Sequence, residues 1–234
     1  MSKKRIIVGV SGASGAPVAL AILQALRSFP DWETHLILSR CARQTLRHET
    51  DVTPDALCAL AEYSHEPEDI GAAVASGTFR TEGMVVVPCS MKSLAGIACG
   101  YADNLLLRAA DVCLKERRLL VLAVRETPLH ALHLANMERL ARLGAVIMPL
   151  MMSFYVRPRS MEDMTRHMAG KILACFGLEL PGFQRWGEDA QAGRVPRTRT
   201  MALSGALWHK RAHRRRARRA RPGIHNAPRK GKDL

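Results

Sequence analysis

The feature that most constrains the fold is an alternation of short apolar runs with helical patterns along residues 4–176. Five runs rich in Val, Ile and Leu span residues 4–10, 34–39, 84–88, 118–124 and 145–149. Continuous apolar strands that alternate with helices are typical of a parallel sheet covered by helices on both faces. The sequence therefore predicts an α/β fold built on a doubly wound parallel sheet.

The segments between and after these runs have the periodicity of helices. We predict helices over residues 18–26, 41–49, 51–63, 90–99, 104–115, 130–143 and 160–176. Local signals support two of them. Thr53-Pro54 is a typical helix start. The last helix has Glu162 and Asp163 in its first turn and Gly177 as its stop.

Charge is distributed unevenly and divides the chain in two. The formal net charge is +14, but residues 189–234 hold 14 Lys/Arg against 2 Asp/Glu, and residues 1–188 hold 21 against 19. We expect 1–188 to form one domain and 189–234 to be a basic, disordered tail, because the tail offers no apolar face to bury. The high net charge thus says little about what the domain binds.

The cysteines and the apolar segments indicate a cytoplasmic protein. None of the six cysteines forms a CxxC pair, and no histidine lies at zinc-ligand spacing from them, so we expect neither disulfides nor a metal. The apolar run 6–10 is too short for a signal peptide, and no segment approaches the length of a membrane span.

Polar residues follow each predicted strand. In chain order they are Gly12-Ala13-Ser14, Ser39, Ser90-Met91-Lys92-Ser93, Arg125-Glu126 and a loop that holds Tyr155. Because parallel strands end at the same edge of a sheet, these five clusters should gather there, where doubly wound folds bind ligands. The helix after Gly12 and Gly15 would direct its N–H groups at an anion. We therefore predict a nucleotide or phosphate site at this edge.

Several of these residues also have purely structural interpretations. The glycines are not spaced as GxGxxG, and small residues also serve tight strand–helix packing. Cys89 follows a buried strand without an obvious base, so we favour a structural thiol. His130 and His133 lack a third ligand. Glu49 alone would pass for a surface carboxylate.

Ordered motifs over residues 5–188 carry a family resemblance. They are GVSGASGAPVAL, Glu49-Thr50, VVPCSMKSLAGIA, RAADVCLKERRLLVLAVRE, HLANM, LGAVIMP, SFY and RWGE. Together they resemble the UbiX-type flavin prenyltransferases. The PCSMK form is most similar to the branch named after phenolic acid decarboxylase. The resemblance implies a Rossmann-like (flavodoxin-like), three-layer flavoprotein fold, assembled as a homododecamer.

The resemblance also implies an activity. The dimethylallyl group of dimethylallyl phosphate would be joined to N5 and C6 of reduced FMN, without a metal. The product, prenylated FMN, would pass to a UbiD-type aromatic acid decarboxylase.

Site residues follow from the same motifs. For FMN the resemblance implies Gly12, Ala13, Ser14, Ser39, Ser90, Met91, Lys92, Ser93 and Arg125. For the prenyl phosphate it implies Tyr155, Lys171 and Arg108, and as catalytic residues Glu49, Lys115, Glu126 and Ser14, some from neighbouring subunits. Glu49 would handle the proton of ring closure, and Trp186 would lie in a segment that closes over the site.

Three positions depart from the family pattern. Lys171 stands where many members have Arg, which would replace a two-pronged phosphate contact by a point charge. Val124 replaces a Pro before Arg-Glu, and Ala135 replaces a Glu.

Three other functions stay open. A related flavoprotein could decarboxylate a cysteinyl substrate, but this normally needs a catalytic histidine, for which His35 and His48 are poor candidates. The chain itself could decarboxylate hydroxyaryl acids. The basic tail could bind nucleic acid, although no aromatic residue interleaves its arginines.

Overall fold

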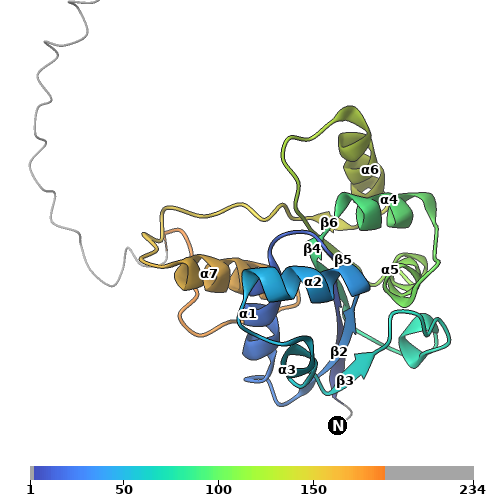
Figure 1. Ribbon diagram of the computed structural model, residues 1–234, viewed down its shortest axis with the longest axis horizontal. Helices are drawn as coiled ribbons and strands as arrows, with labels where there is room; N and C mark the ends of the chain where they lie inside the picture. Colours follow the sequence, from blue (N-terminus) through green and yellow to red (C-terminus); the bar gives the residue numbers. More distant parts are fainter. Residues whose placement is uncertain (1–2, 188–234) are drawn as a thin grey trace, which may run out of the picture. The chain divides into compact units, whose positions relative to one another are not determined.

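The computed structural model describes residues 3–187, which form a six-stranded sheet (Figure 1). The strands are β1 (Lys4–Val10), β2 (Trp32–Leu38), β3 (Tyr63–His65), β4 (Gly83–Cys89), β5 (Leu119–Val124) and β6 (Val146–Ile147). Every pairing between them is parallel, in the order β3-β2-β1-β4-β5-β6. The chain reverses its direction of winding between β1 and β4, as the predicted doubly wound sheet requires.

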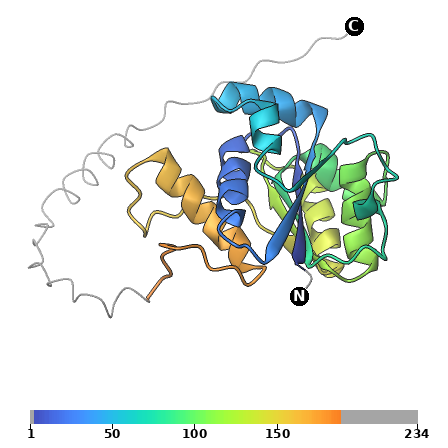
Figure 2. The same ribbon diagram turned by 90° about the horizontal axis from the view of Figure 1, so that it is seen from below.

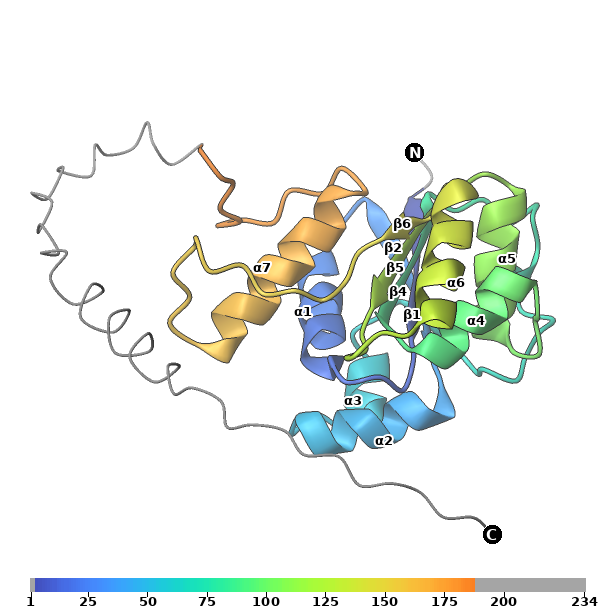
Figure 3. The ribbon, with the colours of Figure 1, turned by 90° about the horizontal axis from the view of Figure 1, so that it is seen from above.

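Helices cover both faces of the sheet (Figures 2 and 3). They are α1 (Ala16–Leu26), α2 (Arg40–Glu49), α3 (Pro54–Cys58), α4 (Met91–Cys99), α5 (Leu105–Lys115), α6 (Ala131–Arg142) and α7 (Met161–Ala174), with a 3-10 turn η1 (Ala73–Ala75). Figure 3 shows α1 and α7 on one face and α4, α5 and α6 on the other. The predicted three-layer α/β fold is therefore confirmed.

Two apolar cores result, one on each face. Ile6, Val8 and Val10 of β1 pack toward α1 and α7, while Ile7 packs with Met84 toward α4 and α5. Side chains alternate between faces along a strand, so a strand buried on both faces must be apolar throughout. This is why the strands were visible in the sequence as continuous apolar runs.

The predicted helix over 51–63 is wrong in length. Helix α3 ends at Cys58, and Tyr63 begins β3, which pairs with β2 at His35. The Glu62 carboxylate accepts the N–H of Thr34 at 2.8 Å and so fixes the approach of β3 to the sheet. A tertiary pairing thus overrides the helical pattern of residues 59–63. The last strand is also shorter than expected, Val146–Ile147.

His35 lies in a stacked polar cluster between β2 and the outermost strand, β3. It is 3% exposed and lies 3.0 Å from Glu33 Oε1 and 2.9 Å from His65 Nε2. Its ring stacks on Tyr63 at 4.9 Å between ring centroids. Burial lowers the pKa of His35, although the hydrogen bond that its ring donates to Glu33 opposes this shift, and burial also lowers the pKa of His65. These contacts make His35 a structural residue.

The cluster predicts an acid-sensitive fold. In the unfolded chain both imidazoles titrate near their ordinary pKa of 6.5, whereas in the folded chain their pKa values are lower. Below about pH 6.5 the unfolded state therefore binds more protons, and the free energy of unfolding should fall with pH. Urea unfolding at pH 7.5 and 5.5 measures this loss. His35→Gln should reduce it, whereas the exposed His48→Gln should not; equal pH dependence in both variants would contradict the assignment.

Two further predictions concern membrane spans and the basic tail. None of the helices within residues 3–187 has the length and apolarity to span a bilayer. The predicted basic tail, 189–234, lies outside the described residues.

Candidate functional site

Ser11 joins the loops that follow β1 and β4. It is buried, its hydroxyl donates to the carbonyl of Pro88 at 2.7 Å, and its Oγ accepts the N–H of Ser90 at 2.8 Å. The β1 loop with Gly12-Ala13-Ser14 and the β4 loop with Ser90 therefore meet at the switch point of the sheet. Ser11 was not among the predicted residues, although a serine directly after an apolar run was a visible signal.

Glu49 closes the β1 loop from the end of α2. Its Oε2 accepts the N–H groups of Gly15 and Ala16, both at 2.8 Å. The half-buried carboxylate thus binds at the N-terminus of α1, where the helix dipole favours an anion. The anion predicted at this helix is the protein's own, and Glu49 is not a free surface carboxylate.

Two glycines make this closure sterically feasible. Gly15 has φ +124°, a conformation that side chains disfavour, and a Cβ there would lie 2.9 Å from Leu150. A Cβ on Gly12 would lie 2.4 Å from Cβ of Cys41 in α2. The hydroxyl of Thr45 donates to the carbonyl of Gly12 at 3.1 Å. Both glycines therefore serve close packing, which leaves backbone rather than side chains at the edge.

The predicted serines are helix caps. Ser39 caps α2 by accepting the N–H of Ala42, and Ser90 caps α4 by accepting the N–H of Ser93 at 3.3 Å. The Ser90 hydroxyl also donates to Ser93 Oγ, which is nearly buried. Within residues 3–187 no hydrogen bond is made to the N–H groups of Met91 and Lys92. These N–H groups at the N-terminus of α4 are thus free to donate to an anion, with the exposed Lys92 beside them.

Arg125 and Glu126 follow β5 at the same edge. The N–H of Arg125 donates to the carbonyl of Cys89 at 3.1 Å, which attaches this loop to the β4 loop. Both side chains are exposed, and Glu126 accepts the N–H of Thr127 at 2.9 Å. No ion pair joins them among the described residues, so the guanidinium remains available to a ligand.

Tyr155 and Lys171 lie on the α1/α7 side of the sheet. Tyr155 lies in the loop after β6, and Lys171 lies in the last turn of α7, which packs on α1. The Tyr155 hydroxyl lies 3.4 Å from Nε2 of His167, and its ring meets Trp186 edge-on at 5.3 Å between centroids. A cavity of about 660 Å³ adjoins this cluster, and Arg157, Arg159, Arg166 and His167 are among its lining residues.

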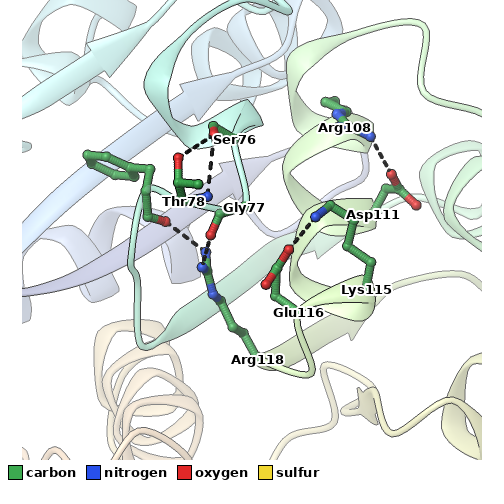
Figure 4. A network of polar contacts seen from close by, with 9 residues as sticks. Ser76, Gly77, Thr78, Arg108, Asp111, Lys115, Glu116 and Arg118 are labelled. Atoms are coloured by element: carbon green, nitrogen blue, oxygen red, sulfur yellow. Dashed lines mark hydrogen bonds and ion pairs between the residues drawn. The ribbon is translucent and has the colours of Figure 1, made fainter.

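Lys115 lies at the other edge of the sheet, where the amino ends of the strands meet. It ends α5, directly before β5 begins, and a Cβ on Gly77 would lie 2.6 Å from its Nζ. Figure 4 shows Lys115 paired with Glu116 near Gly77 and Arg118. Since the Glu49 and Arg125 loops follow the carboxyl ends of β strands, one chain does not bring Lys115 to them.

Arg108 and the thiols have local roles. Arg108 pairs with Asp111 at 2.7 Å on the same helix (Figure 4). Cys89 and Cys113 are fully buried, and burial raises the pKa of each thiol to about 12. At neutral pH they are therefore protonated, which agrees with the structural interpretation of Cys89.

Two histidines lie at the start of α6, His130 as its N-cap residue and His133 in its first turn. His130 and His133 stack at 3.5 Å between ring centroids, and within residues 3–187 no three potential ligands gather. We call the edge of the sheet at the carboxyl ends of the strands the carboxyl edge. It offers the carboxylate of Glu49, the free N–H groups at the N-terminus of α4, Lys92 and Arg125. This set suits a ligand that carries both phosphate and exchangeable protons.

Comparison with known proteins places the chain among flavoproteins. The family described as Flavoprotein matches residues 1–172. Flavin prenyltransferase UbiX of Escherichia coli (strain K12) is 52% identical over 185 residues, which cover 78% of this chain and 98% of the relative.

Two solved structures share the fold over most of the chain. The dodecameric FMN-dependent UbiX-like decarboxylase from Escherichia coli O157:H7 is 50% identical, has a TM-score of 0.77, and aligns over 78% of this chain and 98% of its own. AnUbiX (PadA1), in complex with FMN and dimethylallyl pyrophosphate, is 48% identical with the same TM-score, over 79% and 97%.

Proposed function

This chain belongs to the flavoprotein family, among the UbiX-like flavin prenyltransferases, and from that premise we propose how its residues carry out prenyl transfer. The enzyme joins a dimethylallyl group to FMN. We propose dimethylallyl phosphate as the donor and reduced FMN, at N5 and C6, as the acceptor. The observation that carries the proposal is the fixed carboxylate of Glu49, which the N–H groups of Gly15 and Ala16 hold beside the loop that follows β1.

The carboxyl edge would hold the flavin. The backbone at Gly12, Ala13 and Ser14 offers polar groups without bulky side chains, and the N-terminus of α4 with Lys92 offers donors to an anion. The exposed Arg125 supplies a fixed positive charge. In the same region Ser39, Ser90, Met91 and Ser93 would line the site. When bound, reduced FMN supplies an electron-rich ring that accepts the allyl carbon.

Glu49 would move the proton. Oε2 is committed to the N–H groups of Gly15 and Ala16, so Oε1 is the oxygen free to accept the proton that ring closure releases at C6. A base held by two backbone donors cannot swing away, and this satisfies the positional requirement of general base catalysis. Ser14, on the same loop, would donate a hydrogen bond to the phosphate.

Cations would stabilise the departing phosphate. Breaking the allylic C–O bond leaves a dianion, and donors placed around it lower the barrier as this charge develops. Lys171 would provide such a donor from the α7 side. The Tyr155 hydroxyl would hold the phosphate before and during bond breaking alike, and Glu126 would orient both side chains. Lys171 makes a point contact where Arg makes two bonds, so we expect a weaker hold on the phosphate than in members with Arg.

A homo-oligomer would complete the site. Lys115 cannot join Glu49 within one chain, so a neighbouring subunit would bring it, and Arg108 of the same helix with it. Large apolar side chains exposed on α6 and the loop after β6 support such contacts: Leu132, Leu134, Met151, Met152 and Phe154 are each more than half exposed. A relative of this chain is a dodecamer, and we propose the same assembly here.

We further propose a cytoplasmic enzyme that passes prenylated FMN to a UbiD-type aromatic acid decarboxylase. The six free thiols support a reducing compartment. Residues 1–188 would form the catalytic domain, and the basic residues 189–234 would not take part.

A second candidate function is decarboxylation by the chain itself, because one related structure is described as a decarboxylase. A decarboxylase would consume a hydroxyaryl acid without any partner protein. Release of carbon dioxide from a hydroxyaryl acid by the purified chain, with FMN as the only added cofactor, would favour this second function.

The deciding experiment is anaerobic incubation of the protein with reduced FMN and dimethylallyl phosphate, followed by mass spectrometry of the flavin. We expect the flavin to gain one five-carbon prenyl unit, because the carboxyl edge provides both a base and hydrogen-bond donors that can bind the phosphate. Tyr155→Phe should slow the gain. A flavin of unchanged mass with the unaltered protein would refute the proposal.

A further inference from the structure

His167 occupies the centre of an aromatic cluster that links three separate segments. It lies in the middle of α7, and its Nε2 lies 3.4 Å from the hydroxyl of Tyr155, in the loop after β6. The Tyr155 ring meets His167 edge-on, at 5.6 Å between centroids and 86°. Tyr155 also meets Trp186 edge-on. Tyr155 is therefore held between a helix residue and the C-terminal segment.

Phe183 holds the His167 ring in this orientation. The two rings stack at 5.0 Å between centroids, with 27° between their planes. Gly170, one turn further along α7, makes room for Phe183, since a Cβ there would lie 2.5 Å from the phenyl ring. The imidazole is thus clamped, and its Nε2 has a fixed direction toward Tyr155.

The charge state of the imidazole also follows from its surroundings. Burial lowers the pKa of His167, and the positive charge of Lys171, four residues along the same helix, lowers it further. The imidazole is therefore neutral at neutral pH, so only one of its nitrogens carries a hydrogen.

The two possible tautomers have opposite effects on Tyr155. If Nε2 carries the hydrogen, it donates to the phenol oxygen, and the phenol O–H remains free to donate elsewhere. If Nδ1 carries it, the phenol must donate to Nε2 and has no hydrogen left for a ligand. Only the first arrangement lets Tyr155 bind a phosphate oxygen. The 3.4 Å separation is at the long end for a hydrogen bond, and such bonds shorten when substrate binds.

We propose that His167 is a positioning residue, whose Nε2–H holds the phenol oxygen of Tyr155 so that the phenol hydrogen points at the phosphate of the allylic substrate. This role rests on the proposed prenyl transfer, because it requires a phosphate beside Tyr155. His167 itself touches neither flavin nor substrate. It determines the affinity for the phosphate through Tyr155.

The test separates substrate affinity from turnover. His167→Phe keeps a ring to stack on Phe183 but removes the donor. We expect its KM for dimethylallyl phosphate to rise about tenfold, the effect of one well-placed hydrogen bond, while kcat changes less than about threefold. Calorimetric titration of dimethylallyl phosphate into the protein with oxidised FMN, which does not turn over, should show the same loss in Kd.

Three variants separate positioning from packing. His167→Gln places an amide donor near the position of Nε2, so it should restore KM to within about threefold. In Tyr155→Phe, the added His167→Phe should raise KM no further, because His167 acts only through the missing hydroxyl. Thr165→Val is the matched control: Thr165 lies on the same helix, two residues earlier, and its hydroxyl donates to the carbonyl of Glu162 at 2.9 Å, not to Tyr155. Its KM should not change.

Different outcomes would refute the positioning role of His167 and the proposed prenyl transfer. If the unaltered protein does not prenylate FMN, the proposed function fails. If it prenylates FMN while His167→Phe leaves both KM and Kd unchanged, the positioning role alone is refuted. Effects of Tyr155→Phe and His167→Phe that multiply would also refute it, because they would show independent contributions.

Discussion

Replacing Glu49 by Gln is expected to slow flavin prenylation by about 10²- to 10⁴-fold, the range for loss of a positioned general base. The Gln side chain has the same shape, and its amide oxygen can still accept N–H groups of Gly15 and Ala16. The β1 loop should therefore keep its structure, and only the ability to accept a proton is lost. A time course of flavin mass after anaerobic mixing with dimethylallyl phosphate measures the rate, and fluorescence titration measures FMN affinity.

Two further variants identify the cause of the loss. Glu68 is an exposed carboxylate that pairs with Arg40 at 3.7 Å, and Arg40 begins the helix that Glu49 ends. Glu68→Gln should therefore leave the rate unchanged. Glu49→Ala removes the acceptor for both N–H groups, so it should weaken FMN binding as well as the rate. If Glu49→Gln kept more than a tenth of the normal rate, Glu49 would be a structural cap of α1 and not the base.

The sequence predicts well what depends on local pattern. Strands β1, β4 and β5 are apolar on both faces, so their positions and common polarity could be inferred, and with them the edge that carries Ser90 and Arg125. The length of α3 could not be inferred in this way, because the pairing of Tyr63 with His35 depends on a contact between Glu62 and Thr34, across 28 residues.

The role of Glu49 shows the same limit. Its position depends on the direction in which α2 leaves β2, which no local pattern specifies. Its partners, Gly15 and Ala16, precede it by more than thirty residues. A carboxylate at a helix end is an ordinary surface feature, and only the tertiary contact makes it the anion at the α1 N-terminus. The family resemblance pointed to Glu49 without giving this reason.

Lys115 is an instructive opposite case. The resemblance groups it with Glu126, yet Lys115 directly precedes the run 118–124, whereas Glu126 follows it. Strand polarity alone therefore assigns the two residues to opposite edges of the sheet, and the structure does so too. Residues that must act together but lie at opposite edges of one chain have to meet between chains.

This separation predicts that two inactive variants will restore each other. Lys115→Ala and Glu49→Gln should each lose most activity, because each removes one part of every site. Mixed oligomers, obtained by co-expression with two different tags and purification on both, should regain about a quarter of the normal activity. If subunits assemble at random, about one site in four combines an intact Glu49 from one chain with an intact Lys115 from its neighbour.

The matched control pairs Glu49→Gln with Ser14→Ala. Ser14 lies on the β1 loop that Glu49 closes, so both residues serve the site of one chain, and mixing these variants should restore nothing beyond the residual activity of Ser14→Ala. Recovery with Lys115→Ala but not with Ser14→Ala would place the phosphate between subunits. No recovery in either mixture would mean that Lys115 does not act on a neighbour's site. Lys171 and Tyr155 would then have to hold the phosphate without it, because within a single chain Lys115 lies beside Gly77 at the far edge of the sheet.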